Sequence, residues 1–187
     1  MVILASSSPR RKELLAQLKL PFKIVPSDVA ELVNENLTAG ELCQVNAYRK
    51  ARAVSKKFPD AVVIGVDTLV SLGRKVYGKP ASKSDARRML AELQGHTHQV
   101  LSGVCLIHLR EHRQKVFADQ THVTFRSLSP TDITKYHKKV DPLDKAGAYA
   151  IQQQGDDLVE KISGSFTNVV GLPLERLQAE LVNFQQR

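Results

Sequence analysis

The sequence has few cysteines, few aromatic residues and no long uninterrupted apolar run. Its 187 residues include two cysteines, Cys43 and Cys105, which lie far apart and outside any CxxC pair. This argues against a disulfide scaffold or a zinc–thiolate site and favours a reducing compartment. The apolar run AVVIGVDTLVSL is interrupted by Asp67 and is too short to span a bilayer. The first residues also lack the basic segment of a secretory signal. We therefore expect a cytoplasmic protein without a membrane segment.

Acidic residues are outnumbered by basic ones. The chain has 27 Lys and Arg against 19 Asp and Glu, a net charge of +8, and a pI of about 9.6. This balance admits nucleic acid, an anionic membrane surface or a phosphorylated small molecule as partner. Aromatic residues make up only 5% of the chain and there is no Trp, so base stacking by interleaved aromatic and basic residues is absent. Nucleic acid stays an alternative that these features do not favour.

The apolar pattern predicts strands and helices in alternation, with no repeat. Two long β-rich runs, HQVLSGVCLIHL and KVFADQTHVTFRSL, are joined by a polar turn. Capping-box patterns at Thr38 and Ser82 and a Ser-Pro pair at Ser129 predict helix starts. Another helix is expected from Pro173 to about Phe184. Because long strand pairs are mixed with helices, we expect an α/β fold with a long mixed β-sheet and flanking helices, in one domain over residues 1–187.

The stretch ILASSSPRRKELL near the start combines a short strand with an unusual helix start. Ser8 is placed to cap the helix, and Pro9 suits its first position. Arg10 and Arg11 then put positive charge where the helix dipole is already positive. That arrangement fits an anionic ligand such as a phosphate chain. The alternative is a pair of solvated arginines beside an ordinary cap.

Asp67 is the most informative single residue, because it lies among valines in VVIGVDTLV. A carboxylate in such surroundings is unfavourable unless it is paired or binds a metal. We interpret it as a metal ligand or general base; the alternative is a structural aspartate paired with one lysine. Two lysines are further candidates: Lys79 in YGKP, held extended by the following proline, and Lys50 in a basic helix.

The segment DPLDKAGAYAIQ mixes charged and small residues. An ion pair between Asp144 and Lys145 would order this loop or contribute to a phosphate site. Gln152 carries both a donor and an acceptor, which suits reading the edge of a nucleotide base. The alternative is a tight structural loop. The histidines form no HExxH pattern, and neither a P-loop nor a GxGxxG fingerprint occurs.

Together these stretches resemble a known family. Seven stretches resemble the motifs of the Maf nucleotide pyrophosphatases. In order along the chain they are LASSSPRRKELL, KARAV, VIGVDTLV, GKP, THQVLSGV, DKAGAYAIQ and GSFTNVVGLPL. The resemblance covers nearly the whole chain. It implies a fold related to inosine triphosphatase, with two lobes around a deep cleft, and a homodimer. It also implies hydrolysis of a nucleoside triphosphate between the α and β phosphates, with Mg²⁺ or Mn²⁺ as cofactor.

Matched position by position, the resemblance assigns roles to individual side chains. Ser6, Arg10 and Arg11 would hold the phosphate chain, and Lys50 and Lys79 would add positive charge to it. Glu31 and Asp67 would be the acidic residues that serve metal and water. Which of the two is the ligand and which the base stays open. Ala30 stands where a second acid is common in the family.

The family divides by substrate. Arg10, Thr68 and Gln152 match the branch that resembles dTTP and UTP pyrophosphatases. Gln153 stands where a glycine often follows in the family, which would narrow the pocket. Two alternatives remain: a 7-methyl-GTP pyrophosphatase of the same family, and a non-catalytic basic protein that binds nucleic acid or a division partner.

Overall fold

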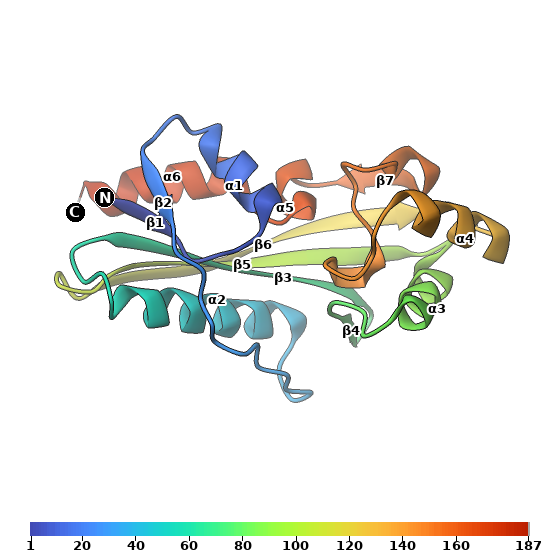
Figure 1. Ribbon diagram of the computed structural model, residues 1–187, viewed down its shortest axis with the longest axis horizontal. Helices are drawn as coiled ribbons and strands as arrows, with labels where there is room; N and C mark the ends of the chain where they lie inside the picture. Colours follow the sequence, from blue (N-terminus) through green and yellow to red (C-terminus); the bar gives the residue numbers. More distant parts are fainter. Residues whose placement is uncertain (187) are drawn as a thin grey trace. The chain divides into compact units, whose positions relative to one another are not determined.

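The computed structural model describes residues 1–186 and contains one mixed sheet with helices packed against it (Figure 1). The strands are β1 (Val2–Leu4), β2 (Phe22–Ile24), β3 (Val62–Leu72), β4 (Lys75–Tyr77), β5 (Thr97–His108), β6 (Arg113–Phe125) and β7 (Val159–Ser163). The helices are α1 (Pro9–Ala16), α2 (Ala39–Ser55), α3 (Lys83–Leu93), α4 (Pro130–Lys139), α5 (Phe166–Val170) and α6 (Leu174–Gln185), with short 3-10 turns η1 (Ala146–Ala148) and η2 (Gly155–Asp157).

The sheet is mixed, as the sequence predicts. Its strand order is β2-β1-β3-β5-β6-β7, and β4 pairs with β3. Strand β1 runs parallel to both β2 and β3, whereas β4 is antiparallel to β3 and β7 is antiparallel to β6. The expected α/β class with flanking helices is therefore confirmed.

The chain forms two compact units. The first comprises Met1–Thr68, Ser102–Asp119 and the segment that begins at Gly171. The second comprises Leu69–Leu101 and Gln120–Val170. The long strands β3, β5 and β6 contribute residues to both units. Each unit has its own cluster of buried hydrophobic side chains.

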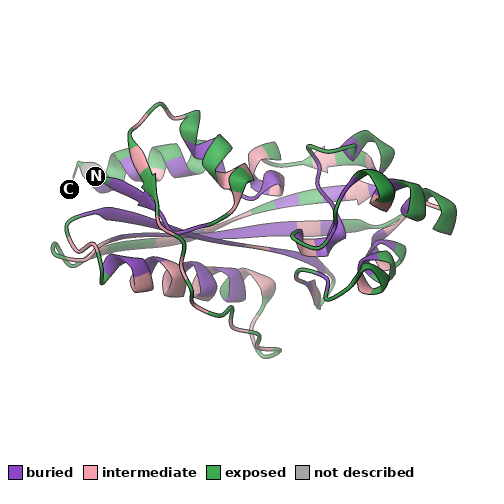
Figure 2. Ribbon diagram, viewed as in Figure 1, coloured by how far each residue is buried: buried purple, intermediate pink, exposed green. Residues whose placement is uncertain are grey.

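In the first unit, α2 lies on one face of the strands, and α1 and α6 lie on the other (Figure 1). Buried residues of β1, β3 and β5, including Ile3, Val63 and Cys105, pack with the inner face of α2. Figure 2 shows that β3 is buried along most of its length, while the outer faces of the helices are exposed. Both cysteines are free and buried, and burial raises the pKa of Cys43 to about 12. The predicted absence of a disulfide is confirmed.

The helix caps follow the sequence with one correction. Ser8 caps α1, and Thr38 and Ser129 form complete capping boxes at α2 and α4. At α3, Ser82 accepts from the Asp85 amide as predicted. The Asp85 carboxylate instead accepts from the amide of residue 81. The prediction of a complete capping box was therefore wrong. The Asp85 carboxylate binds the amide of residue 81 and not that of Ser82.

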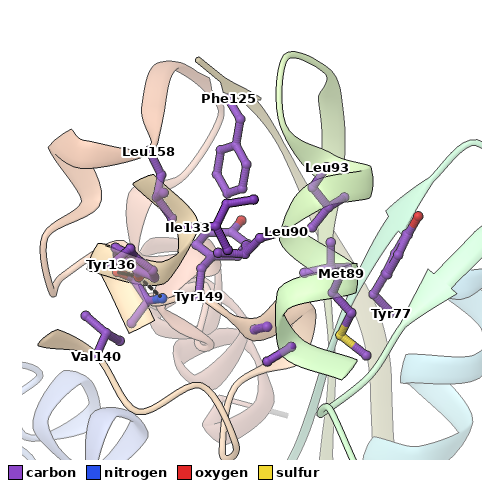
Figure 3. Close-up of a cluster of buried hydrophobic side chains, with 14 of the residues drawn as sticks. Tyr77, Met89, Leu90, Leu93, Phe125, Ile133, Tyr136, Val140, Tyr149 and Leu158 are labelled. Atoms are coloured by element: carbon purple, nitrogen blue, oxygen red, sulfur yellow. Dashed lines mark hydrogen bonds between the residues drawn. The ribbon is translucent and has the colours of Figure 1, made fainter. Parts of the chain in front are cut away.

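The second unit has an aromatic core. His98, Phe125 and Tyr149 pack edge to face, with ring centroids 4.6–5.5 Å apart. Figure 3 shows residues of α3 and α4, among them Leu90 and Tyr136, pointing into this cluster. Burial lowers the pKa of His98 to about 4, so this histidine is a neutral core residue. No helix within residues 1–186 is long and apolar enough to cross a membrane.

Candidate active site

Two glycines allow α2 to lie directly on the backbone of the sheet. A Cβ added at Gly65 would come within 2.2 Å of the Ala47 carbonyl oxygen, and one at Gly103 within 2.3 Å of the Cys43 carbonyl oxygen. Any side chain at these positions would push the helix away. The close approach brings the polar residues of α2 within reach of β3.

The buried Asp67 carboxylate meets two α2 side chains that lie one turn apart. Lys50 Nζ donates to Asp67 Oδ1 at 2.6 Å, and Asn46 Nδ2 donates to Asp67 Oδ2 at 3.4 Å. Lys50 Nζ also donates to Glu31 Oε1 at 2.7 Å. The Asp67 side chain is only 4% exposed, whereas that of Glu31 is 43% exposed. One ammonium thus bridges a buried and an accessible carboxylate.

Asn46 also holds the segment that carries Glu31. Its Oδ1 accepts from the Leu32 amide at 2.7 Å, and its Nδ2 donates to the Leu32 carbonyl at 3.1 Å. This paired contact fixes residues 31–32 against α2. The position of Glu31 therefore depends on a buried asparagine, 2% exposed, that sequence analysis did not single out.

Effects of opposite sign act on the pKa of Asp67. Burial raises the pKa of its carboxyl most strongly, and the neighbouring Glu31 charge raises it too. The Lys50 ammonium lowers that pKa through its charge and its hydrogen bond, and the pKa stays raised overall. A carboxylate whose pKa is raised is a better proton acceptor than an ordinary aspartate. The environment therefore suits a general base.

Arg11 lies beside this cluster and makes several contacts with the protein itself. Its Nε donates to the Gly171 carbonyl at 2.9 Å, and its Nη2 donates to Thr68 Oγ1 at 2.9 Å. Its Nη1 donates to Ser6 Oγ at 3.3 Å and to the Val66 carbonyl at 3.2 Å. Burial lowers the pKa of Arg11, although a guanidinium stays charged. Arg11 thus joins three segments of the first unit around Asp67.

Thr68 is held from three directions. Besides accepting from Arg11, its Oγ1 lies 2.9 Å from Ser102 Oγ and 3.3 Å from the Gly171 carbonyl. Gly171 has φ +123°, a conformation that side chains disfavour, and a Cβ there would lie 3.7 Å from both Arg11 Nε and Thr68 Oγ1. The residue after Asp67 is therefore held rigidly.

The two carboxylates fit a divalent cation. They already share one cation, the Lys50 ammonium, so their oxygens converge. Within residues 1–186, no group of three or more His, Cys, Asp or Glu side chains converges as a metal site. Mg²⁺ usually binds through one or two carboxylates together with substrate phosphates and water. Glu31 and Asp67 match that incomplete protein ligand set.

The other two predicted residues, Lys79 and Gln152, belong to the second unit. Their segments are tied together, because the Gly147 amide donates to the Gly78 carbonyl at 3.1 Å. Both side chains are exposed. Most of the predicted residues therefore lie together in the first unit: Ser6, Arg11, Glu31, Lys50, Asp67 and Thr68. Arg10 lies next to Arg11 in the same unit. Lys79 and Gln152 lie on linked loops of the second unit.

Comparison with known proteins decides the family. The model of the family described as Maf-like protein matches residues 1–184. The chain belongs to the Maf family. The family assignment made from the seven motifs is confirmed.

Named relatives resemble this Maf protein over nearly its whole length. It is 46% identical to a dTTP/UTP pyrophosphatase of Bacillus velezensis, over 98% of the chain and 96% of the relative. It is 47% identical to a dTTP/UTP pyrophosphatase of Moorella thermoacetica, over 98% of the chain and 94% of the relative. A third relative of that name, from Gloeobacter violaceus, is 44% identical over 100% of the chain and 97% of the relative.

The fold of this Maf protein is also found in a solved structure. A HAM1 protein from Coxiella burnetii matches with a TM-score of 0.58 and 16% identity, covering 97% of the chain and 98% of that structure. At this identity the match establishes a shared fold only.

Three contributors to the Maf site escaped sequence analysis: Asn46, Ser102 and Gly171. Asn46 carries a usable signal, because it precedes Lys50 by four residues and so shares its helix face. In β5, Ser102 stands between the apolar pairs Val100-Leu101 and Gly103-Val104. A polar residue in an apolar run is the signal that identified Asp67, but a serine gives it more weakly than a carboxylate. Gly171 contributes a carbonyl, which no side-chain pattern reveals.

Proposed function

We propose that this Maf protein hydrolyses dTTP and UTP between the α and β phosphates, releasing the nucleoside monophosphate and pyrophosphate. The observation that carries the proposal is Asp67, a buried carboxylate held by Lys50 and Asn46 beside the anchored Thr68. Support also comes from three relatives of 44–47% identity that bear the name dTTP/UTP pyrophosphatase.

Asp67 is the proposed general base. Its carboxylate accepts a proton from the attacking water, whose oxygen bonds to phosphorus as the bridging bond breaks. The pyrophosphate leaves with the electrons of that bond. In the metal-free protein burial raises the pKa of this carboxyl, and Asn46 holds its other oxygen in place.

Positive charge on the protein stabilises the phosphates. Lys50 is 12% exposed on its side chain and lies next to Asp67, so it is placed to interact with developing charge near the base. Arg10 and Lys79 are proposed to contact the phosphate chain. Arg11 is proposed to act with Ser6, its hydrogen-bonding partner.

A divalent metal is part of the proposal. Glu31 and Asp67 would hold it, together with phosphate oxygens of the substrate. When bound, Mg²⁺ or Mn²⁺ would neutralise phosphate charge and increase the acidity of a coordinated water. The cytoplasmic location and the homodimer also stay predictions from the sequence.

The test is pyrophosphate release by the purified protein with Mg²⁺ or Mn²⁺, using dTTP, UTP, CTP, GTP and 7-methyl-GTP. Asp67→Asn keeps the shape of the side chain and removes the base. We expect release from dTTP and UTP to fall by about 10²- to 10⁴-fold in this variant. Asp156→Asn, at an exposed position of the second unit, is the matched control.

Each outcome has a defined meaning. Release from dTTP and UTP that needs Asp67 supports the proposal. Release confined to 7-methyl-GTP changes the substrate assignment and keeps the reaction. Absence of release from every nucleotide with either metal overturns the enzymatic proposal.

A further inference from the structure

Lys50 occupies the point at which the two carboxylates of the first unit converge. Its Nζ lies 2.6 Å from Asp67 Oδ1 and 2.7 Å from Glu31 Oε1. Mg²⁺ binds oxygen ligands at about 2.0–2.1 Å, which is closer than the ammonium approaches them. A divalent cation held by both of these oxygens must therefore take the place of the ammonium.

The charges around this point are balanced while Lys50 stays there. Burial lowers the pKa of Arg11, whereas the charges of Asp67 and Glu31 raise it, so Arg11 is electrostatically coupled to both carboxylates. Arg10 adds positive charge beside Arg11. The two carboxylates thus already face at least as many cations. A divalent cation added to this set would leave an excess of positive charge beside a buried aspartate, which is unfavourable in surroundings of low polarity.

Lys50 is the cation that is able to leave. Arg11 donates to two backbone carbonyls and two hydroxyls of the protein, and it would have to break these bonds to move. Lys50 donates to the two carboxylates, and a divalent cation would replace those same bonds. Its charge is carried at the end of a flexible four-carbon chain. Its partner Glu31 is 43% exposed on its side chain, so solvent is close to the ammonium.

The two carboxylates stay in position without Lys50, because Asn46 holds them through other atoms. Asn46 Nδ2 donates to Asp67 Oδ2 at 3.4 Å and to the Leu32 carbonyl at 3.1 Å, and Oδ1 accepts from the Leu32 amide at 2.7 Å. Leu32 directly follows Glu31, so one buried amide fixes both Asp67 and the backbone that carries Glu31. The two oxygens that Lys50 binds take no part in these contacts. They become available together when the ammonium leaves.

We propose that Lys50 and the divalent metal exchange at this point: the ammonium holds Glu31 and Asp67 together in the protein without metal, and it withdraws when the metal binds. This inference rests on the metal site of the proposed function. The released ammonium keeps its charge and its reach, so it becomes available to a phosphate of the substrate. The same lysine is thus first an ion-pair partner of the carboxylates and then a phosphate ligand.

The first experiment follows Lys50 in the unaltered protein without nucleotide. An N-hydroxysuccinimide ester acetylates lysine amines, and mass spectrometry gives the rate at each lysine with and without Mn²⁺. The Lys50 side chain is 12% exposed, so its modification should be slow without metal. We expect Mn²⁺ to raise this rate about tenfold, as the withdrawn state becomes populated. The rate at Lys56, at the exposed C-terminal cap of α2, should stay the same.

A variant gives an independent measurement. In Lys50→Met the metal no longer competes with an ammonium, and a competing state lowers apparent affinity by the fraction of protein that is able to bind. The affinity for Mn²⁺, measured by electron paramagnetic resonance, should therefore rise about tenfold or more. Lys56→Met removes the same charge from the end of the same helix and should leave the affinity unchanged. Adding Asp67→Asn to Lys50→Met should abolish the gain, because the metal then lacks its buried ligand.

The outcomes separate this inference from the proposed function. A Lys50 modification rate that Mn²⁺ leaves unchanged overturns the exchange, even where Lys50→Met fails to fold. So does a Mn²⁺ affinity that is equal or lower in folded Lys50→Met protein. Neither measurement uses a nucleotide, so both decide the exchange even if no triphosphate is cleaved and the proposed hydrolysis fails. Hydrolysis that needs Asp67, in turn, stands when the exchange fails.

Discussion

Lys50 Nζ lies 2.6 Å from Asp67 Oδ1 and 2.7 Å from Glu31 Oε1, so one ammonium is shared by two carboxylates of different exposure. The buried carboxylate and the accessible one therefore influence each other through a common partner. This relationship leads to opposite expectations for changes at its two ends.

The pKa of Asp67 should move in opposite directions when either neighbour is neutralised. Lys50→Met removes the charge that lowers the pKa of Asp67, so this pKa should rise. Glu31→Gln removes a charge that raises it, so the pKa should fall. The measurement is a carbon-13 NMR titration of the Asp67 carboxyl in metal-free protein. Shifts of the same sign in both variants would contradict the arrangement.

Asp67→Asn should leave the fold as stable as the parent protein, or more stable, at pH 7. The folded-state pKa of Asp67 is raised above its ordinary value of 3.8, so ionising this group opposes folding. That penalty is absent below about pH 3.8, grows as pH rises through the folded-state pKa, and is complete above it. Thermal unfolding at pH 7 and at pH 3.5 checks this. A clear loss of stability at pH 7 would show that the ion pair outweighs burial.

Arg10 and Arg11 should respond differently to replacement by lysine. Arg11→Lys loses most of the contacts to Ser6, Thr68 and Gly171. Because each of these groups loses a charged donor inside the protein, unfolding free energy should fall by about 2–4 kcal/mol. Arg10→Lys, the matched control, should change it by less than about 1 kcal/mol. Urea denaturation of the two variants decides the matter. Equal effects would mean that Arg11 is not a structural clamp.

Gly65→Ala should separate α2 from β3. The added Cβ would lie 2.2 Å from the Ala47 carbonyl oxygen, so the helix must shift and stability should fall by about 3 kcal/mol. Turnover should fall as well, because Lys50 and Asp67 move apart. Gly78→Ala is the control, since nothing lies within 4 Å of its added Cβ. Unfolding midpoints that match for the two variants would rule out the close contact.

Tyr136→Phe should loosen the turn before Gln152. The variant loses the hydroxyl that binds the Ala150 amide and two carbonyls. We expect a loss of about 1–3 kcal/mol in unfolding free energy and faster hydrogen exchange at the Ala150 amide. Tyr48→Phe serves as the control, because Tyr48 is a partly buried tyrosine on α2 that packs against the core of the first unit. Unchanged exchange at Ala150 would contradict the anchoring role.

Local structure was determined by the sequence alone to a large extent. The Thr38–Glu41 capping box and the Ser8 and Ser129 caps depend on contacts between residues three apart, so they were predictable without a fold. Asp67 was identified because a carboxylate among valines needs a partner. The seven motifs were enough to identify the Maf family, which the family match confirmed.

The partners of these residues were decided only by the tertiary structure. Arg11 binds a carbonyl 160 residues away, and Asp67 meets Lys50 and Asn46 because two glycines let α2 rest on the strands. Such contacts depend on the distance between packed elements, which sequence spacing does not encode. For the same reason, the sequence presented Arg10 and Arg11 as an equivalent pair, whereas packing gave Arg11 a distinct set of protein contacts.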